Sequence, residues 1–271
     1  MGIVQSVSTR EVYPNAPIVL VAAEVRHAKS APLTDSQVAV LKRHLRDEFP
    51  LLKTLTQTQV LPFAQATQTT ARTFPRFVNR ERTSSVTFQD EAVVYETTRY
   101  AQFEHLQAVM ERAFSALAEC QNPDGLERVG LRYIDEIRAP EDPSGPLEWA
   151  EWVDSSLIGP ACKASRLDVP AEQWQGQVVF RPSTEDSLVL RYGSASGYAI
   201  DPQGELTRTS PPPGPFFLLD IDSFWMPLSL VPEFNAEHVL AHLARLHDPV
   251  RNLFESLVTD RLRDEVFRYV K

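Results

Sequence analysis

Two carboxylates, Asp220 and Asp222, stand two positions apart in an apolar stretch that is typical of a β-strand. Alternate residues of a strand share one face, so both side chains point the same way. Unpaired like charges raise the pKa of one member, and this is how general acids and Mg²⁺ sites arise. Two interpretations stay open: a functional carboxylate pair, or carboxylates that arginines neutralise where the strand leaves the core.

Charged side chains also stand in the strands expected to be central, namely Glu24 with Arg26, and Arg132 with Glu136. Buried charges in sheets are normally paired, which predicts a structural ion-pair network. The alternative is a ligand pocket between two halves of the chain, because the planar fork of arginine binds carboxylate or phosphate through two bonds. The candidate ligand-binding residues are Arg26 and Arg132 as anion clamps, Tyr133 as an aromatic wall, and Asp220 and Asp222 as acceptors.

One segment mixes basic and aromatic residues, as nucleic-acid channels do. It contains Arg72, Phe74, Arg76, Phe77, Arg80 and Arg82. The formal net charge of −9 and Glu81 inside the segment make nucleic acid an unfavourable partner. We therefore expect a solvated strand edge, with an acidic protein surface or nucleic acid as the alternatives.

The common cofactor and metal motifs are missing from the sequence. Neither GxGxxG nor GxxxxGK[ST] occurs, so no nucleotide cofactor is expected. Residues 193–197 resemble a nucleophile elbow but carry Ala195 at the centre, which predicts a small-residue hairpin loop. His238 and His242 have helical spacing, yet a zinc site needs a further ligand, so we expect no metal.

Composition places the chain among ordinary globular proteins, with 43% hydrophobic and 23% charged residues. Its longest apolar run, residues 18–23, is far shorter than the ~20 residues of a membrane-spanning helix. The two cysteines, Cys120 and Cys162, make no disulfide framework, which favours reduced thiols and a cytoplasmic setting.

Hydrophobic periodicity and turn residues predict the elements. Strands are expected at residues 18–27, 57–61, 76–89, 92–99, 128–138, 177–181, 187–192, 197–200 and 216–225. Helices are expected after the capping box at Thr34, over residues 103–117 and 147–157, and after Asn235, with an interruption at Pro249 and a last helix from Thr259.

The two parts of the chain repeat one pattern. Each opens with a strand that ends in Glu-aliphatic-Arg, at residues 24–26 and 136–138, and continues as helix, strands and helix. The Asn-Pro-Asp-Gly turn at residues 122–125 separates them. We predict an α+β fold with a mostly antiparallel sheet and helices on one face. Its β-α-β-β-β-α halves, residues 1–122 and 123–271, form two domains or one continuous domain.

Several short segments, in order along the chain, resemble a known family. They are residues 15–19, 24–26 and 48–50, the central run Arg-Val-Gly-Leu-Arg-Tyr-Ile-Asp at 128–135, and residues 246–254 and 259–260. Together they resemble the sporadically distributed bacterial TIGR04255 family. Asp135 departs from the Asn more frequent there. The resemblance implies no established activity or catalytic residues, and the patchy distribution implies a defence or specialised-metabolism locus.

The expected function is that of a non-catalytic bacterial accessory protein that recognises a protein, a peptide or a small anionic ligand. A hydrolase or isomerase is the first alternative, with Asp220 or Asp222 as general base and Arg132 stabilising negative charge. A nucleic-acid-associated defence component that uses residues 72–82 is the second. The sequence predicts no membrane partner and leaves the oligomeric state open.

Overall fold

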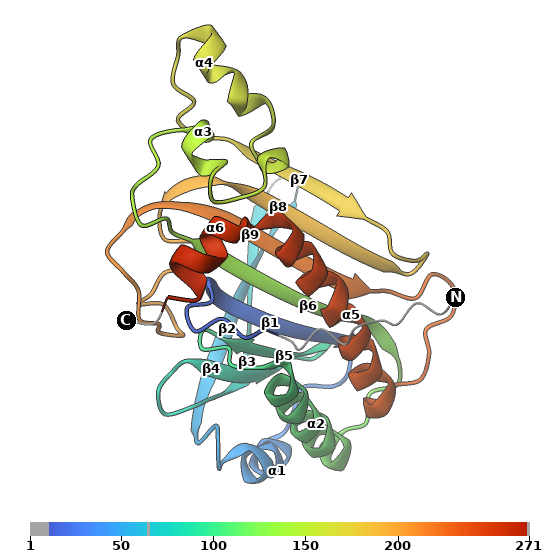
Figure 1. Ribbon diagram of the computed structural model, residues 1–271. Helices are drawn as coiled ribbons and strands as arrows, with labels where there is room; N and C mark the ends of the chain where they lie inside the picture. Colours follow the sequence, from blue (N-terminus) through green and yellow to red (C-terminus); the bar gives the residue numbers. More distant parts are fainter. Residues whose placement is uncertain (1–10, 64–65, 270–271) are drawn as a thin grey trace, which may run out of the picture.

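One antiparallel sheet of nine strands runs through the protein, in the order β2-β3-β4-β5-β1-β6-β9-β8-β7 (Figure 1). The structure is a computed structural model that describes residues 11–63 and 66–269. The strands are β1 (Ile18–His27), β2 (Leu51–Phe63), β3 (Ala66–Val78), β4 (Ser84–Phe88), β5 (Ala92–Thr97), β6 (Leu126–Ile137), β7 (Gln175–Phe180), β8 (Asp186–Gly197) and β9 (Gly214–Trp225).

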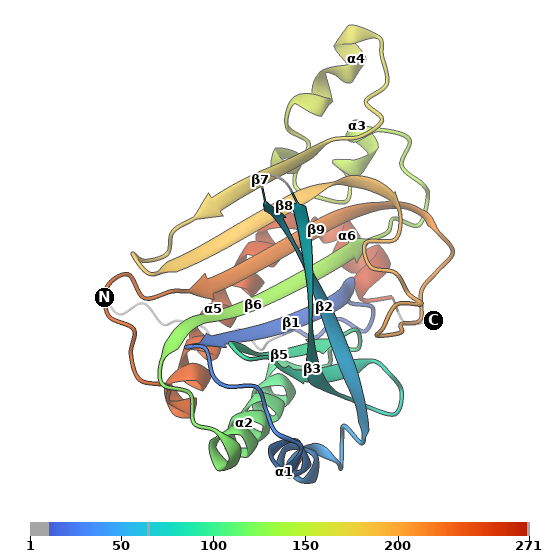
Figure 2. The same cartoon turned by 180° about the vertical axis from the view of Figure 1, so that it is seen from behind.

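Three long helices cover one face of this sheet, α1 (Asp35–Leu45), α2 (Phe103–Cys120) and α5 (Ala236–Leu257). Helix α2 contacts α1 on one side and α5 on the other. The short helices are α3 (Pro146–Trp149), α4 (Ala164–Leu167) and α6 (Asp260–Leu262). Seen from behind, the long helices lie beyond the sheet, and the near face, here called the open face, carries none of them (Figure 2). The predicted α+β fold with helices on one face is confirmed.

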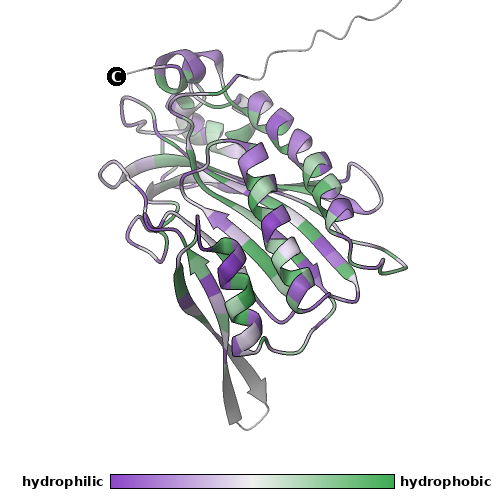
Figure 3. Ribbon diagram, turned by 90° about the horizontal axis from the view of Figure 1, so that it is seen from below, coloured by the Kyte–Doolittle hydropathy of each residue, from purple (hydrophilic) through white to green (hydrophobic). Residues whose placement is uncertain are grey.

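The core lies between the sheet and the long helices. Strand β1 alternates, so that Val21, Ala23 and Val25 are fully buried, whereas Glu24 and Arg26 retain exposure on the open face. Helix α2 buries the predicted stripe of Phe103, Leu106, Met110, Phe114 and Leu117. Figure 3 shows hydrophobic and hydrophilic residues alternating along the helices. An amphipathic helix gains most of its stability from burying such a stripe.

Strands β1 and β6 form the central pair, and the order outward from them repeats. Strands β5, β4 and β3 follow β1, while β9, β8 and β7 follow β6. Helix α2 comes after β5 and helix α5 after β9. The second half follows the predicted β-α-β-β-β-α order, with short helices between β6 and β7, whereas the first half has four strands, β2 to β5, between α1 and α2. The sheet is continuous, and one hydrophobic cluster contains residues of both halves. A domain boundary at residues 122–123 remains a prediction.

The strands predicted at residues 57–61 and 76–89 have different bounds. Strands β2 and β3 pair from Leu51 with Val78 to Phe63 with Ala66, yet β3 pairs with β4 only over residues 76–78. The hairpin therefore extends beyond the sheet, and we call residues 54–75 the β2–β3 arm. Figure 2 shows both strands running across the direction of the central strands.

A turn, rather than continuous strand, separates β3 from β4. Asn79 Oδ1 accepts hydrogen bonds from the backbone nitrogens of Thr83 and Ser84, at 2.8 and 3.0 Å. Arg82 adopts a φ of 56° within this turn. Asparagine favours such turns because its side chain bonds to the backbone a few residues further on.

Three further predictions are wrong. Residues 193–197 form no loop, because β8 continues to Gly197. The glycine at 193 suits the strand, since a Cβ there would lie 2.5 Å from the carbonyl oxygen of Trp174. Helix α5 continues through Pro249, with its buried stripe on both sides of the proline. Of the helix expected at 147–157, only α3 and a single 3-10 turn, Ser155–Leu157, form.

The helices described in this structure lack the combination of length and apolar composition that crossing a membrane requires.

Candidate functional site

The open face of the sheet carries most of the predicted site. Arg132 on β6 donates from Nε and Nη2 to the two carboxylate oxygens of Asp220 on β9, both at 2.7 Å. Arg191 on β8 lies 3.4 Å from the same carboxylate. The Asp220 side chain is only 6% exposed, so this bidentate pair neutralises a buried charge.

A second group of ion pairs lies beside the first. Arg128 donates to Glu24 at 2.8 Å and reaches Asp222 at 3.4 Å, while Arg26 donates to Glu24 at 2.7 Å. The guanidinium of Arg128 occupies the space above Gly130, where a Cβ would lie 2.3 Å from its Nη1. Burial raises the pKa of Asp222, and the charge of Arg128 acts in the opposite direction. Sequence reasoning missed Arg128, although Gly130 on the same strand face was a signal of this close approach.

The structure does not bring the predicted ligand-binding residues together in one cleft between the halves. Strands β1 and β6 are hydrogen-bonded neighbours, so no gap separates the halves there. Arg26, Arg132, Asp220 and Asp222 lie on the open face in ion pairs, which favours the structural interpretation. Tyr133 faces the helices instead, because consecutive residues of a strand point to opposite faces. The geometry therefore gives no support to Asp220 as a general base.

Residues of the basic-aromatic segment, 72–82, also form contacts within the fold. Arg76 is buried and pairs with Glu96 at 3.2 Å and with Glu205. Phe77 is fully buried in the core. These two residues are therefore not available to a nucleic acid, and the expected solvated strand edge is wrong for them.

On the helix side of β6, Tyr133 takes part in a chain of polar groups. Its hydroxyl lies 3.2 Å from the hydroxyl of Tyr100 and 3.1 Å from Nδ1 of His247 on α5. The ring of His247 stacks on Phe103 at 4.2 Å between centroids. Burial raises the pKa of the Tyr133 hydroxyl well above its ordinary value, so Tyr133 stays protonated.

Asp135 lies two residues further along the same face of β6 and is 2% exposed. Within the part of the chain that the structure describes, its Oδ1 has no hydrogen-bond partner. Burial raises the pKa of Asp135 to about 8, and the negative charge of Asp220 adds to this effect. At neutral pH the side chain is therefore an uncharged carboxylic acid. Sequence reasoning did not select Asp135, although it alternates with Leu131 and Tyr133 on one apolar strand face.

Tyr133 and Asp135 line a pocket of about 220 Å³, here called the Tyr133–Asp135 pocket. The pocket lies between β6, the start of α2, helix α5 and residues 11–18. Its walls are largely aromatic and aliphatic, with Tyr13, Tyr100, Phe103, Val250 and Phe254, and its charged lining residues are Glu11, Glu104, Arg251 and Glu255, with His247. Small-molecule sites combine such apolar walls with a few convergent polar groups.

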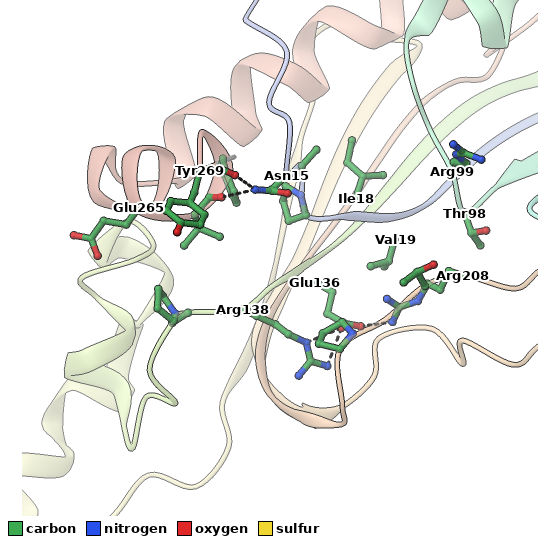
Figure 4. A pocket seen from close by; sticks show the side chains of 18 of the residues that line it. Asn15, Ile18, Val19, Thr98, Arg99, Glu136, Arg138, Arg208, Glu265 and Tyr269 are labelled. Carbon is green, nitrogen blue, oxygen red and sulfur yellow. Dashed lines mark hydrogen bonds and ion pairs between the residues drawn. The ribbon is translucent and has the colours of Figure 1, made fainter. Parts of the chain in front are cut away.

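A wider pocket of about 1280 Å³ lies where β1 begins and β6 ends (Figure 4). Glu136 stands between Arg138 and Arg208, which donate to it at 2.9 and 2.7 Å. The backbone nitrogen of Ala199 donates to the same carboxylate at 2.8 Å. Arg138 and Arg208 also donate to backbone carbonyls, of Gly197 and Ile200. Their charges thus serve to hold the loop between β8 and β9.

The described residues contain no group of three or more histidine, cysteine or acidic side chains placed to hold a metal ion. His242 stacks on Trp225 at 4.2 Å instead. Comparison with known proteins adds no assignment, because no protein-family model and no curated protein matches this sequence.

Proposed function

We propose that the protein is a non-catalytic binding protein whose small ligand occupies the Tyr133–Asp135 pocket. The observation that carries this proposal is that Asp135 lines the pocket while its buried Oδ1 has no hydrogen-bond partner among the residues that the structure describes. An unsatisfied buried polar group weakens the fold by about 1–3 kcal/mol. A ligand that bonds to Asp135 would remove this penalty. Ligand binding would therefore account for a carboxyl group at this buried position.

The pocket can be tested by filling its rim. Ala101 is exposed and lines the pocket just before α2, so Ala101→Trp places an indole at the entrance without disturbing the core. Ala118 is exposed near the other end of α2, and Ala118→Trp is the matched control. Native mass spectrometry after incubation in bacterial extract should detect a bound small molecule on wild type and Ala118→Trp only. No bound molecule on wild type, or equal binding by all three, would overturn the proposal.

A protein or peptide partner on the open face is a second candidate. The observation that favours it is the exposure of Arg132 and Arg191, whose side chains are 45% and 43% exposed on a face without long helices. Arg191→Ala leaves the bidentate pair of Arg132 intact. Affinity capture from the native host should lose a specific partner with this variant, whereas equal capture would remove the candidate.

We further propose a cytoplasmic setting. Cys120 and Cys162 are both free thiols in the structure, which suits a reducing compartment.

A further inference from the structure

Arg251 brings an unneutralised positive charge to the Tyr133–Asp135 pocket. It is half-buried on the face of α5 that also presents His247, Val250 and Phe254 to the pocket. No acid in the described part of the chain forms an ion pair with it. Two of the three glutamates that line the pocket are engaged elsewhere, since Glu11 pairs with Arg268 and Glu255 with Arg263. A free guanidinium beside a pocket is suited to a ligand carboxylate.

Asp135 offers a different interaction at the strand wall. Arg132 and Arg191, which neutralise Asp220, lie on the opposite face of the sheet, so Asp135 keeps its proton. A protonated carboxyl has one O–H donor. Tyr133 is already bonded to Tyr100 and His247, whereas Asp135 retains a donor that can bond a ligand oxygen.

The walls and the volume favour a single aromatic ring. Tyr13, Tyr100, Phe103 and Phe254 supply ring faces and edges around the pocket. A dry engineered cavity of about 150 Å³ holds benzene. At about 220 Å³, this pocket has room for one ring with two small substituents.

Building on the proposed function, we propose that the ligand is an aromatic monocarboxylate with an oxygen substituent on the far side of the ring. Arg251 pairs with its carboxylate, and Asp135 donates a hydrogen bond to the ring oxygen. The rim acids disfavour a second negative charge on the ligand.

Three probes separate these contacts: para-hydroxybenzoate, benzoate and para-hydroxybenzamide. Calorimetric titration should show wild type binding para-hydroxybenzoate most tightly. Arg251→Gln should weaken both carboxylates by about tenfold or more, the value of a charged hydrogen bond, and leave the amide unchanged. Arg46→Gln is the control, because Arg46 follows the last residue of α1 and its side chain is 70% exposed. This variant should bind all three probes as wild type does.

The contact with Asp135 is tested by two substitutions, one that removes the hydrogen-bond donor and one that keeps a donor. Asp135→Ala should weaken the two hydroxylated probes and spare benzoate, whereas Asp135→Asn keeps an N–H donor and should retain binding. Circular dichroism confirms that each variant is folded. The proposal is overturned if the amide binds wild type as well as the carboxylates do, or if Arg251→Gln affects all probes equally.

The outcomes also separate this inference from the proposed function. If no probe binds wild type but a different small molecule is lost on Ala101→Trp, the ligand class is wrong and the binding function stands. If the probes bind Ala101→Trp as tightly as wild type, both proposals fail.

Discussion

Asp220 and Asp135 are both nearly inaccessible carboxyl groups, 4% and 2% exposed, yet they have opposite surroundings. Two arginines neutralise Asp220, whereas no cation contacts Asp135 among the residues described. Burying an unpaired charge is so unfavourable that the group takes up a proton instead. The same residue type therefore gives an ion pair on one face of the sheet and a neutral acid on the other.

Removal of Arg132 should destabilise the fold. Arg132→Ala deprives buried Asp220 of two short hydrogen bonds, and we expect the free energy of unfolding to fall by about 1–3 kcal/mol in urea titrations. Arg26→Ala is the control, because the Arg26 side chain is 54% exposed and such surface pairs contribute about 1 kcal/mol or less. Equal losses for the two variants would contradict the importance of the Asp220 pair.

Asp135 should make stability depend on pH. Its pKa is about 8 in the folded protein, against about 3.9 in an unfolded chain, so unfolding releases a proton between these values. The stabilisation from Asp135 is fully present below pH ~4 and is lost as pH rises towards about 8.

Asp135→Asn cannot ionise, and provides the reference for this effect. The free energy of unfolding of wild type minus that of Asp135→Asn should decrease across this range and become constant above it. Urea unfolding at a series of pH values measures the difference. A difference that does not change with pH would show that Asp135 is ionised in the folded protein.

The sequence predicted which residues of a strand share a face, but not which side chains on other strands they pair with. The alternation of strand residues correctly indicated that Asp220 and Asp222 share a face. Pairing Arg132 with Asp220, or Arg128 with Glu24, requires the register between strands far apart in the chain. Tyr133 was placed with the arginines, although a neighbouring strand position points to the other face.

At the scale of the elements, local signals predicted where α1 and α5 begin. The capping box is present, with Gln37 Oε1 accepting from the Thr34 nitrogen at 2.9 Å. Asn235 caps α5 as predicted. The predicted break at Pro249 failed because packing of Val239, Leu243 and Leu246 before it and Val250 after it holds both segments on one axis. Tertiary burial outweighed the local preference of proline.

The β2–β3 arm should be dispensable for folding. Joining Leu55 directly to Phe74 through an Asn-Gly turn removes pairs between β2 and β3 and the exposed ion pair of Arg72 with Asp90, and keeps the residues of β3 that pair with β4. We expect one cooperative melting transition with a melting temperature within a few degrees of wild type. Loss of cooperative unfolding in the shortened chain would show that the arm supports the sheet.

At the scale of the whole molecule, the central β1–β6 pair makes the halves interdependent. All four tryptophans lie in the second half, at positions 149, 152, 174 and 225. Their fluorescence therefore reports on that half, whereas far-ultraviolet circular dichroism reports on both. We expect coincident urea transitions by the two methods, because one sheet and one core join the halves. Separate transitions would support two domains divided at residues 122–123.

The central position of β1 also affects how the protein is made. The ribosome completes β1 at His27, yet its partner β6 begins only at Leu126. At ~5–20 residues per second, translating the intervening stretch takes roughly 5–20 s. During that time one edge of a strongly apolar strand has no partner, and nascent chains on neighbouring ribosomes can pair with it. A chaperone that covers residues 18–27 during this time would therefore raise the yield of folded protein.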